Sequence, residues 1–147
     1  MTPLPKAQSD LFKLTQYLVD RRGFIPAIRR MNVQHSHEED ERNEDDPRGF
    51  CHVTNQSWVI SCAQVIEDIR PEVRVGILLH EFFHLYLPAL NGDESEVDVD
   101  SAILEQVPEA GYYYMPRYKY VNTFKGRVVV AKNLQCVSSE FVNGRLA

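Results

Sequence analysis

The residues best suited to chemistry are the five that read His80-Glu81-Phe82-Phe83-His84. Two imidazoles four positions apart lie on one face of a helix, so their ring nitrogens can meet a single ion at about 2.0–2.1 Å. Glu81 is rotated off that line, where its carboxylate can take a proton from a metal-bound water instead of binding the metal itself. The spacing therefore predicts a zinc site with an acid–base group beside it.

The same five residues have a plainer interpretation, in which the histidines are satisfied core residues and Glu81 lies on the helix surface. The surrounding segment, residues 71–87, is apolar on nearly every face, which is typical of a helix buried in the middle of a domain. Burying two imidazoles and a carboxylate is costly unless something pairs with them. This cost favours the metal site.

A catalytic zinc ion needs a third protein ligand and one open position. A second helix, predicted at about 94–107, carries several acidic residues. Its apolar positions define a buried face, and Glu96 lies on that face. We therefore predict Glu96 as the third ligand, with Asp100 as the alternative.

Asp100 lies only about 40° around this helix from Glu96, whereas Asp98 lies about 200° away, toward solvent. If Glu96 binds the metal, Asp100 can accept the remaining ring N–H of a ligating histidine and so fix its tautomer. Asp93 and Glu94 are explained by the preference of a helix N-terminus for negative charge.

These residues together resemble a known family. His80 to His84, followed by a helix with Glu96-x-x-x-Asp100, resembles the gluzincin clan of zinc metallopeptidases. The segment that begins at Glu96 also resembles the Glu-x-x-Ala-Asp/Asn-x-x-Ala segment of the small ImmA/IrrE-like peptidases. The resemblance covers residues 71–107.

The resemblance implies an α+β, minimal zincin-like fold. Such a fold has an N-terminal support helix, a small and mostly antiparallel sheet, a buried active-site helix and a ligand-bearing helix. It implies His80, His84 and Glu96 as zinc ligands and Glu81 as the catalytic acid and base. Metals other than zinc, such as cobalt, nickel or manganese, would fit the same ligands.

Hydrolysis also needs a hydrogen-bond donor for the oxyanion. We name Tyr112, Tyr114 and His52 as possible donors, although tyrosines at such spacing are also typical of core or edge-strand packing. In related small zincins an edge strand aligns the substrate, and here the strand at 57–61 or the one before it is the predicted edge.

The remaining elements follow from periodicity and turn residues. The first helix is predicted at about 10–22, with Ser9 as its cap and Gly23 at its end. The active-site helix begins at Pro71 and ends at Pro88, and the next helix is closed by Pro108. Strands are predicted at 27–33, 50–53 and 57–61, and strands or an extended tail at 112–120 and 127–130.

Length and composition predict one domain, residues 1–147, since 147 residues with 44% hydrophobic side chains can bury a core of their own. Residues 35–48 hold seven carboxylates and almost nothing apolar, so we expect a solvated acidic loop. Two histidines in it, His35 and His37, could hold a metal only loosely. Three cysteines at no metal-ligand spacing suggest reduced thiols.

The charge distribution bears on partners and location. The net charge is −5, and the middle of the chain is acidic while both ends are basic, so binding to nucleic acid is disfavoured. No signal sequence and no stretch long enough to span a membrane is recognisable, which predicts a cytoplasmic protein. A protein or peptide substrate is the expected partner. The alternative function is a catalytically silent zincin-like domain that binds a partner or serves in assembly.

Overall fold

The computed structural model describes residues 4–35, 51–53, 58–89, 96–115, 120–124, 127–131 and 134–147. The helices are α1 (Lys6–Arg22), α2 (Pro71–Ala89) and α3 (Glu96–Gln106), with short 3-10 helices η1 (Pro26–Arg30), η3 (Gln64–Asp68) and η4 (Pro108–Ala110) and a π-helix η5 (Phe141–Arg145). The strands are β1 (Asn32–Gln34), β2 (Cys51–Val53), β3 (Val59–Cys62), β4 (Tyr113–Met115), β5 (Tyr120–Phe124), β6 (Arg127–Ala131) and β7 (Leu134–Cys136).

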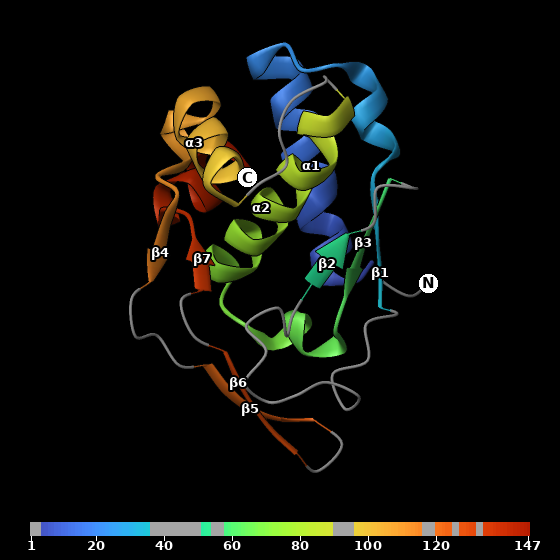
Figure 1. Cartoon of the computed structure of the whole chain (residues 1–147), viewed down its shortest axis with the longest axis vertical. Coiled ribbons are helices and arrows are strands. Elements are labelled where there is room, and N and C mark those ends of the chain that lie inside the picture. Colours follow the sequence, from blue (N-terminus) through green and yellow to red (C-terminus); the bar gives the residue numbers. More distant parts are fainter. Residues whose placement is uncertain are drawn as a thin grey trace.

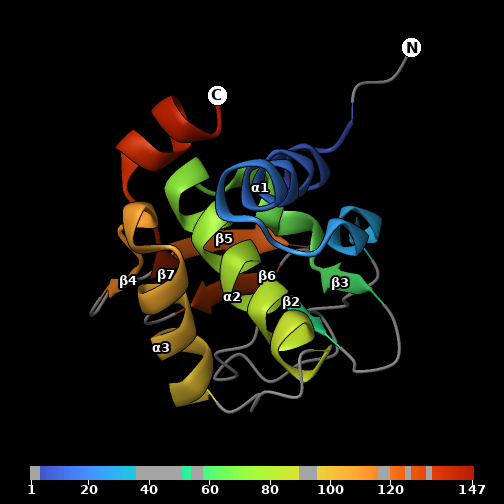
Figure 2. The same ribbon diagram turned by 90° about the horizontal axis from the view of Figure 1, so that it is seen from above.

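Helix α2 runs through the middle of the molecule, between α1 on one side and α3 on the other (Figure 1, Figure 2). The strands form three small sheets: β1-β3-β2, β4-β7 and β5-β6. Three of these four strand pairs are antiparallel, and β1 runs parallel to β3. The chain is thus a mixed α+β protein, as the sequence predicts, but its strands do not join into one sheet within the described residues.

The central helix is buried along almost its whole length, which matches the all-round apolar pattern of its sequence. Buried positions run without a break from Val73 to His80 and continue through both phenylalanines of the histidine segment. Our prediction that Pro88 ends this helix is wrong, since α2 continues to Ala89. A proline in the last turn loses only one backbone hydrogen bond, and its fixed φ is already helical.

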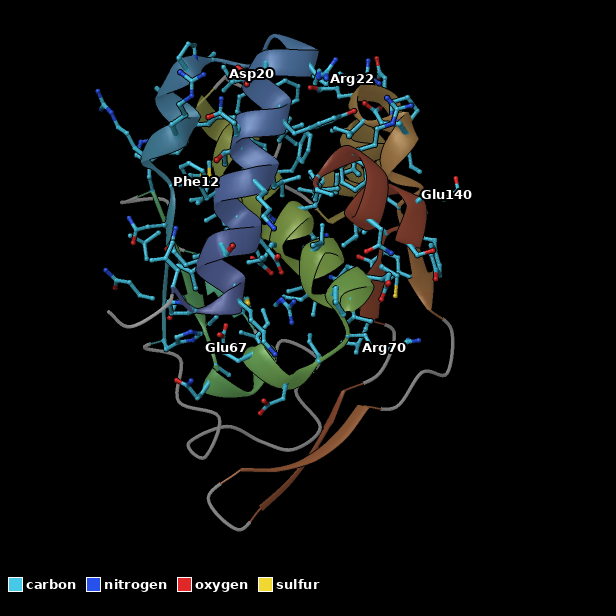
Figure 3. The ribbon with its side chains drawn as sticks, turned by 180° about the vertical axis from the view of Figure 1, so that it is seen from behind. Phe12, Asp20, Arg22, Glu67, Arg70 and Glu140 are labelled. Atoms are coloured by element: carbon cyan, nitrogen blue, oxygen red, sulfur yellow. The ribbon has the colours of Figure 1, made fainter. Side chains whose placement is uncertain are left out.

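Helix α1 begins earlier than predicted and is not capped by Ser9. Its first residue is Lys6, and the carboxylate of Glu67 in η3 accepts the backbone N–H groups of Lys6 at 2.6 Å and Ala7 at 2.9 Å. Glu67 lies beneath this end of the helix (Figure 3). A negative side chain there satisfies two free donors and offsets the helix dipole. The helix ends as predicted, with Gly23 in the left-handed region at φ 68°.

The strand predicted at 27–33 is wrong over most of its length, and one of the two predicted edge strands is not at an edge. Residues 26–30 form the 3-10 helix η1, and only Asn32–Gln34 pair as a strand. Pro26 at the start of η1 has the φ of a helical turn and no N–H to give to a sheet. Of the two strands proposed as the sheet edge, β3 lies between β1 and β2, whereas the preceding strand, β2, is the outer one among the described strands of this sheet.

One glycine sets the distance between α2 and strand β7. A Cβ atom on Gly76 would lie 2.7 Å from the backbone of Cys136 and of Gln135. Only glycine therefore lets the helix approach β7 this closely. Gly76 stands one turn before His80, so β7 lies against the same face of α2 as the first histidine.

Three further predictions from the sequence can be compared with the structure: reduced cysteines, an acidic loop at residues 35–48, and the lack of a segment that spans a membrane. Cys51, Cys62 and Cys136 are buried, and none of them is in a disulfide. The predicted acidic loop lies outside the described residues except for His35, whose Nε2 lies 3.6 Å from a carboxylate oxygen of Glu67. Within the described ranges, no helix combines the length and the apolar character needed to cross a membrane.

Candidate metal centre

The two histidines of the central helix turn their Nε2 atoms toward each other. These atoms are 3.1 Å apart, and the ring centroids are 4.7 Å apart. His80 is 2% exposed, while His84, one turn later, is half-buried. The pair therefore presents two nitrogen donors at one point, at the border between the core and the surface.

This separation fits a shared metal ion. Two nitrogens that each lie about 2.0–2.1 Å from a tetrahedral zinc ion are about 3.3 Å apart. The observed 3.1 Å between the two Nε2 atoms is close to that value. Neutral imidazole is also a common zinc donor, so both the geometry and the chemistry of the pair suit this ion.

The other nitrogen of His80 lies against a carboxylate and a hydroxyl group. Its Nδ1 is 3.3 Å from Oδ1 of Asp100 and 3.0 Å from the hydroxyl oxygen of Tyr112. The Tyr112 hydroxyl in turn donates to Oδ1 of Asp100 at 2.8 Å. The three groups thus form a closed triangle behind His80, on the ring edge away from Nε2.

Burial keeps the Tyr112 hydroxyl in its neutral form. Desolvation, above all, raises the pKa of the Tyr112 hydroxyl far above its ordinary value, with further contributions from Tyr114 and Asp100. Tyr112 is therefore a neutral phenol that donates its single proton, and the carboxylate of Asp100 is its acceptor. A second hydroxyl, from Tyr114, donates to the same carboxylate oxygen at 3.2 Å.

The packing of α3 on α2 explains why Asp100 reaches His80. Val99 and Ile103 are fully buried on α3 and fix which side of that helix faces inward. Asp100 is adjacent to this face and is half-buried. The sequence analysis predicted this position of Asp100 from the same helical periodicity.

Glu96 is the first residue of α3, and its side chain lies outside the described part of the structure. Its backbone position can still be related to the histidines. Glu96 lies one turn before Asp100 on α3, and the carboxylate of Asp100 lies at Nδ1 of His80. Among the described side chains, no three potential metal ligands gather at one point.

The other predicted residues have different positions. Glu81 follows His80 on α2 and is half-buried. Tyr112 has its hydroxyl at Nδ1 of His80, which favours a supporting role and not the predicted contact with an oxyanion in front of Nε2. Tyr114 directs its hydroxyl to Asp100 as well. The side chain of His52 lies outside the described residues.

A short backbone turn positions Tyr112, and sequence reasoning gave no reason to expect it. Gly111 adopts φ 63° between η4 and Tyr112, and the N–H of Ser138 donates to the carbonyl of Ala110 at 2.9 Å. Strand β4 then pairs with β7, with Tyr113 opposite Cys136. Because glycine favours the left-handed conformation at the end of a helical turn, Gly111 is the sequence feature that could have predicted this turn.

Comparisons with known proteins leave the family of this chain open. The chain matches no protein-family model, no curated protein and no solved structure. The argument for function therefore rests on the residues of the site.

Proposed function

We propose that the chain is a zinc-dependent metallopeptidase that hydrolyses peptide bonds in a protein or peptide substrate, on a minimal zincin-like fold of the ImmA/IrrE-like type. One observation carries the proposal: the Nε2 atoms of His80 and His84 meet at 3.1 Å on a buried helix, with a carboxylate behind the first ring. Core histidines without a metal need no such convergence, because each ring could bond to a separate partner.

In this proposal Glu96 completes the ligand set, with Asp100 as the alternative. The position of Asp100 at Nδ1 of His80 supports its role as the carboxylate that orients this ring. It leaves the first turn of α3 as the place from which a third donor can come. Replacement of Glu96 by Ala should then abolish metal binding, whereas Asp100→Ala should only weaken it.

The chemistry assigned to the chain is acid–base catalysis by Glu81. A zinc ion bound at the histidines would polarise the attacking water and the scissile carbonyl. The Glu81 carboxylate accepts the proton that the water loses as its oxygen bonds to the carbonyl carbon. The same group returns that proton to the nitrogen as the C–N bond breaks, so that one carboxylic acid and one amine are formed.

The proposal is tested by metal content together with one conservative substitution. Protein purified without chelator should contain about one zinc ion per chain by elemental analysis. Glu81→Gln should keep the zinc and lose roughly 10²- to 10⁴-fold of the cleavage rate on a random-sequence peptide mixture followed by mass spectrometry. Glu105→Gln, at an exposed position of α3, is the matched control and should behave like the unmodified chain.

Two results would contradict the proposal that the chain is an enzyme. A chain that binds no zinc would remove the basis of the site. A Glu81→Gln variant that keeps both its zinc and every measured activity would show that the metal is structural, and would favour the alternative of a catalytically silent domain that binds a partner.

A further inference from the structure

We propose that the cavity between α1, η4 and η5 binds a phosphate monoester group, held by the guanidinium groups of Arg21, Arg22 and Arg145. This cavity is separate from the candidate metal centre, because none of the residues that line it belongs to that centre. The proposal therefore adds a second binding function to the chain and does not depend on the proposed zinc chemistry.

The cavity is open to solvent and has a volume of about 330 Å³. It lies where the end of α1 meets the two short helices η4 and η5, and we call it the arginine pocket (Figure 3). Five residues line it: Tyr17, Arg21, Arg22, Glu109 and Arg145. Pockets of this size are at the lower end of the range for ligand sites, so a phosphoryl group with a small part of the molecule that carries it can fit.

Contacts between the three elements give the arginine pocket a fixed wall. The carboxylate of Glu109 accepts hydrogen bonds from the Tyr17 hydroxyl and from two nitrogens of Arg22, with Nε at 2.7 Å. Tyr17 also packs edge to face against Phe141 of η5, with ring centroids 5.4 Å apart. Because Arg145 is on the same short helix as the buried Phe141, its backbone is held beside α1, from which it is far apart in the sequence.

The charges in the arginine pocket do not cancel. Glu109 compensates one of the three guanidinium groups and the Tyr17 phenol is neutral, since burial raises its pKa. The pocket therefore has a net charge of +2, in a chain whose net charge is −5. Within the part of the chain that the structure describes, neither Arg21 nor Arg145 forms an ion pair or donates a hydrogen bond. Like charges at one place repel one another, so an anion that enters the pocket is attracted.

A phosphate monoester matches both the charge and the donors. It carries a charge of about −1.5 to −2 at pH 7 and offers three strong acceptor oxygens. Arginine presents planar pairs of N–H donors that fit such oxygens. Arg22 gives two of its five N–H donors to Glu109 and keeps three. A carboxylate ligand, with one charge and two oxygens, would leave half of the net charge uncompensated.

The dipole of α1 explains only part of this arrangement. Arg21 and Arg22 lie in the last turn of α1, where positive side chains are favoured in any case. Arg145 belongs to a different element, and its place at the same cavity adds repulsion between like charges. A bound anion would compensate this repulsion, which is why we assign the pocket to a ligand and not to the stability of the helix.

The first experiment titrates the full-length protein with sodium phosphate at about pH 7.5, where the ion is mostly divalent, and follows the backbone amides by ¹H–¹⁵N NMR. We expect saturable shifts at residues 20–23, 109–111 and 143–146, with a dissociation constant of roughly 1 mM or lower. Sodium chloride at the same ionic strength should not produce them. Shifts spread over the whole surface, or no shifts, would refute the site.

A capped tripeptide with a central phosphoserine distinguishes two sources of the phosphoryl group. Binding at least about tenfold tighter than that of phosphate would support the site and assign the group to a phosphorylated protein. Peptide binding that is no tighter than phosphate binding would support the site and assign it to free phosphate or a small ester. The tripeptide with unmodified serine is the control, and the phosphate proposal is wrong if it binds equally well.

The second experiment compares Arg145→Gln with Arg29→Gln. Arg29 is an arginine on η1 that lies 3.3 Å from Asp20 and outside the arginine pocket, so it is the matched control. Arg145→Gln should weaken phosphate binding about 5- to 10-fold, and Arg29→Gln less than about twofold. Arg21→Gln tests the opposite wall and should have an effect similar to that of Arg145→Gln. Equal losses in Arg145→Gln and Arg29→Gln would show a general attraction to positive charge and would refute a defined pocket.

The outcome is independent of the candidate metal centre. A chain that binds phosphate in the arginine pocket but binds no zinc would refute the proposed function and keep this site. A chain that binds zinc and cleaves peptides, but shows no saturable phosphate binding, would do the reverse.

Discussion

The two sides of helix α2 carry different kinds of side chain. The side that faces α1 is aromatic: Phe82, Phe24 and Tyr86 pack together, with Phe24 and Tyr86 stacked at 4.7 Å and Phe82 and Tyr86 at 5.4 Å. The side that faces α3, β4 and β7 holds both histidines and the groups behind them. A single buried helix thus combines a packing face with a polar face.

Because of this difference, the residues that hold α2 in place are not the residues that form the candidate metal site. The aromatic side removes a large apolar area from water and fixes the position of α2. On the polar side each buried group has a partner, so this side adds order but little net stability. Substitutions on the two sides should therefore change different observables, namely the free energy of unfolding and the metal affinity.

The largest expected effect is on the aromatic side. Phe82→Ala should lower the free energy of unfolding by about 3–5 kcal/mol, because the ring is fully buried and its removal leaves a cavity. The zinc affinity of the molecules that remain folded should stay within about twofold of the original, since Phe82 points away from the histidines. Urea unfolding and chelator competition measure the two quantities.

A matched control for this variant is Leu104→Ala. Leu104 is 56% exposed on α3, so its removal should change the free energy of unfolding by less than about 0.5 kcal/mol. If Phe82→Ala instead weakens zinc binding as strongly as it weakens folding, the two sides of α2 are not independent, and the contrast drawn here is wrong.

The intermediate effect belongs to the polar side. Asp100→Asn keeps the shape of the side chain but removes its negative charge. The amide has a single acceptor oxygen, whereas the carboxylate has two that can accept from His80 and Tyr112. We expect a 10- to 100-fold loss of zinc affinity and a change of less than about 1 kcal/mol in the unfolding free energy of the metal-free protein. The measurements are the same two as for Phe82→Ala.

The control for Asp100→Asn is Glu105→Gln, at an exposed position on the same helix. It removes one negative charge from α3 without touching the site, so zinc affinity should be retained. A loss of affinity shared by both variants would show that Asp100 acts only through its long-range charge and does not orient His80.

The sequence alone was sufficient for the elements with strong periodicity. Helices α1 and α3 lie close to their predicted positions because each buries a regular apolar face, and α2 does so because its sequence is apolar on nearly every side. The errors occurred where a distant residue or a tertiary contact decides the structure. Glu67 caps α1 from about sixty positions away, and no local pattern at Ser9 could reveal it. Strand β7 and helix η5 were not predicted, since both are short and held by their neighbours.

The same distinction applies to the site. The histidine pair, and the nearness of Asp100 to it, follow from helical spacing within α2 and α3. The position of Tyr112 depends on the turn at Gly111 and on the pairing of β4 with β7, which joins segments about twenty residues apart. Periodicity within one element cannot supply such information, so the sequence suggested Tyr112 only as a possible oxyanion donor and gave no reason to expect its hydroxyl at Nδ1 of His80.

The smallest expected effect concerns the link between the two sides of α2. Glu109 in η4, beyond α3, accepts hydrogen bonds from Tyr17 and Arg22 of α1, with Nε of Arg22 at 2.7 Å. Burial would raise the pKa of this carboxyl group, but the bonds from Arg22 and Tyr17 outweigh it and lower the pKa to about 2. Since Arg22 is partly exposed, solvent screening keeps the contribution of this contact modest.

Because its pKa is lower in the folded state, the contribution of Glu109 to stability is complete above about pH 4.5 and is lost as the pH falls toward 2. Over this range Glu109 binds more protons in the unfolded chain than in the folded one, and the difference is at most one proton. Glu109→Gln should therefore flatten the pH dependence of the urea midpoint below pH 4.5 and leave zinc affinity at neutral pH unchanged. An identical acid dependence in both proteins would mean that Glu109 makes no pH-dependent contribution to the contact between η4 and α1.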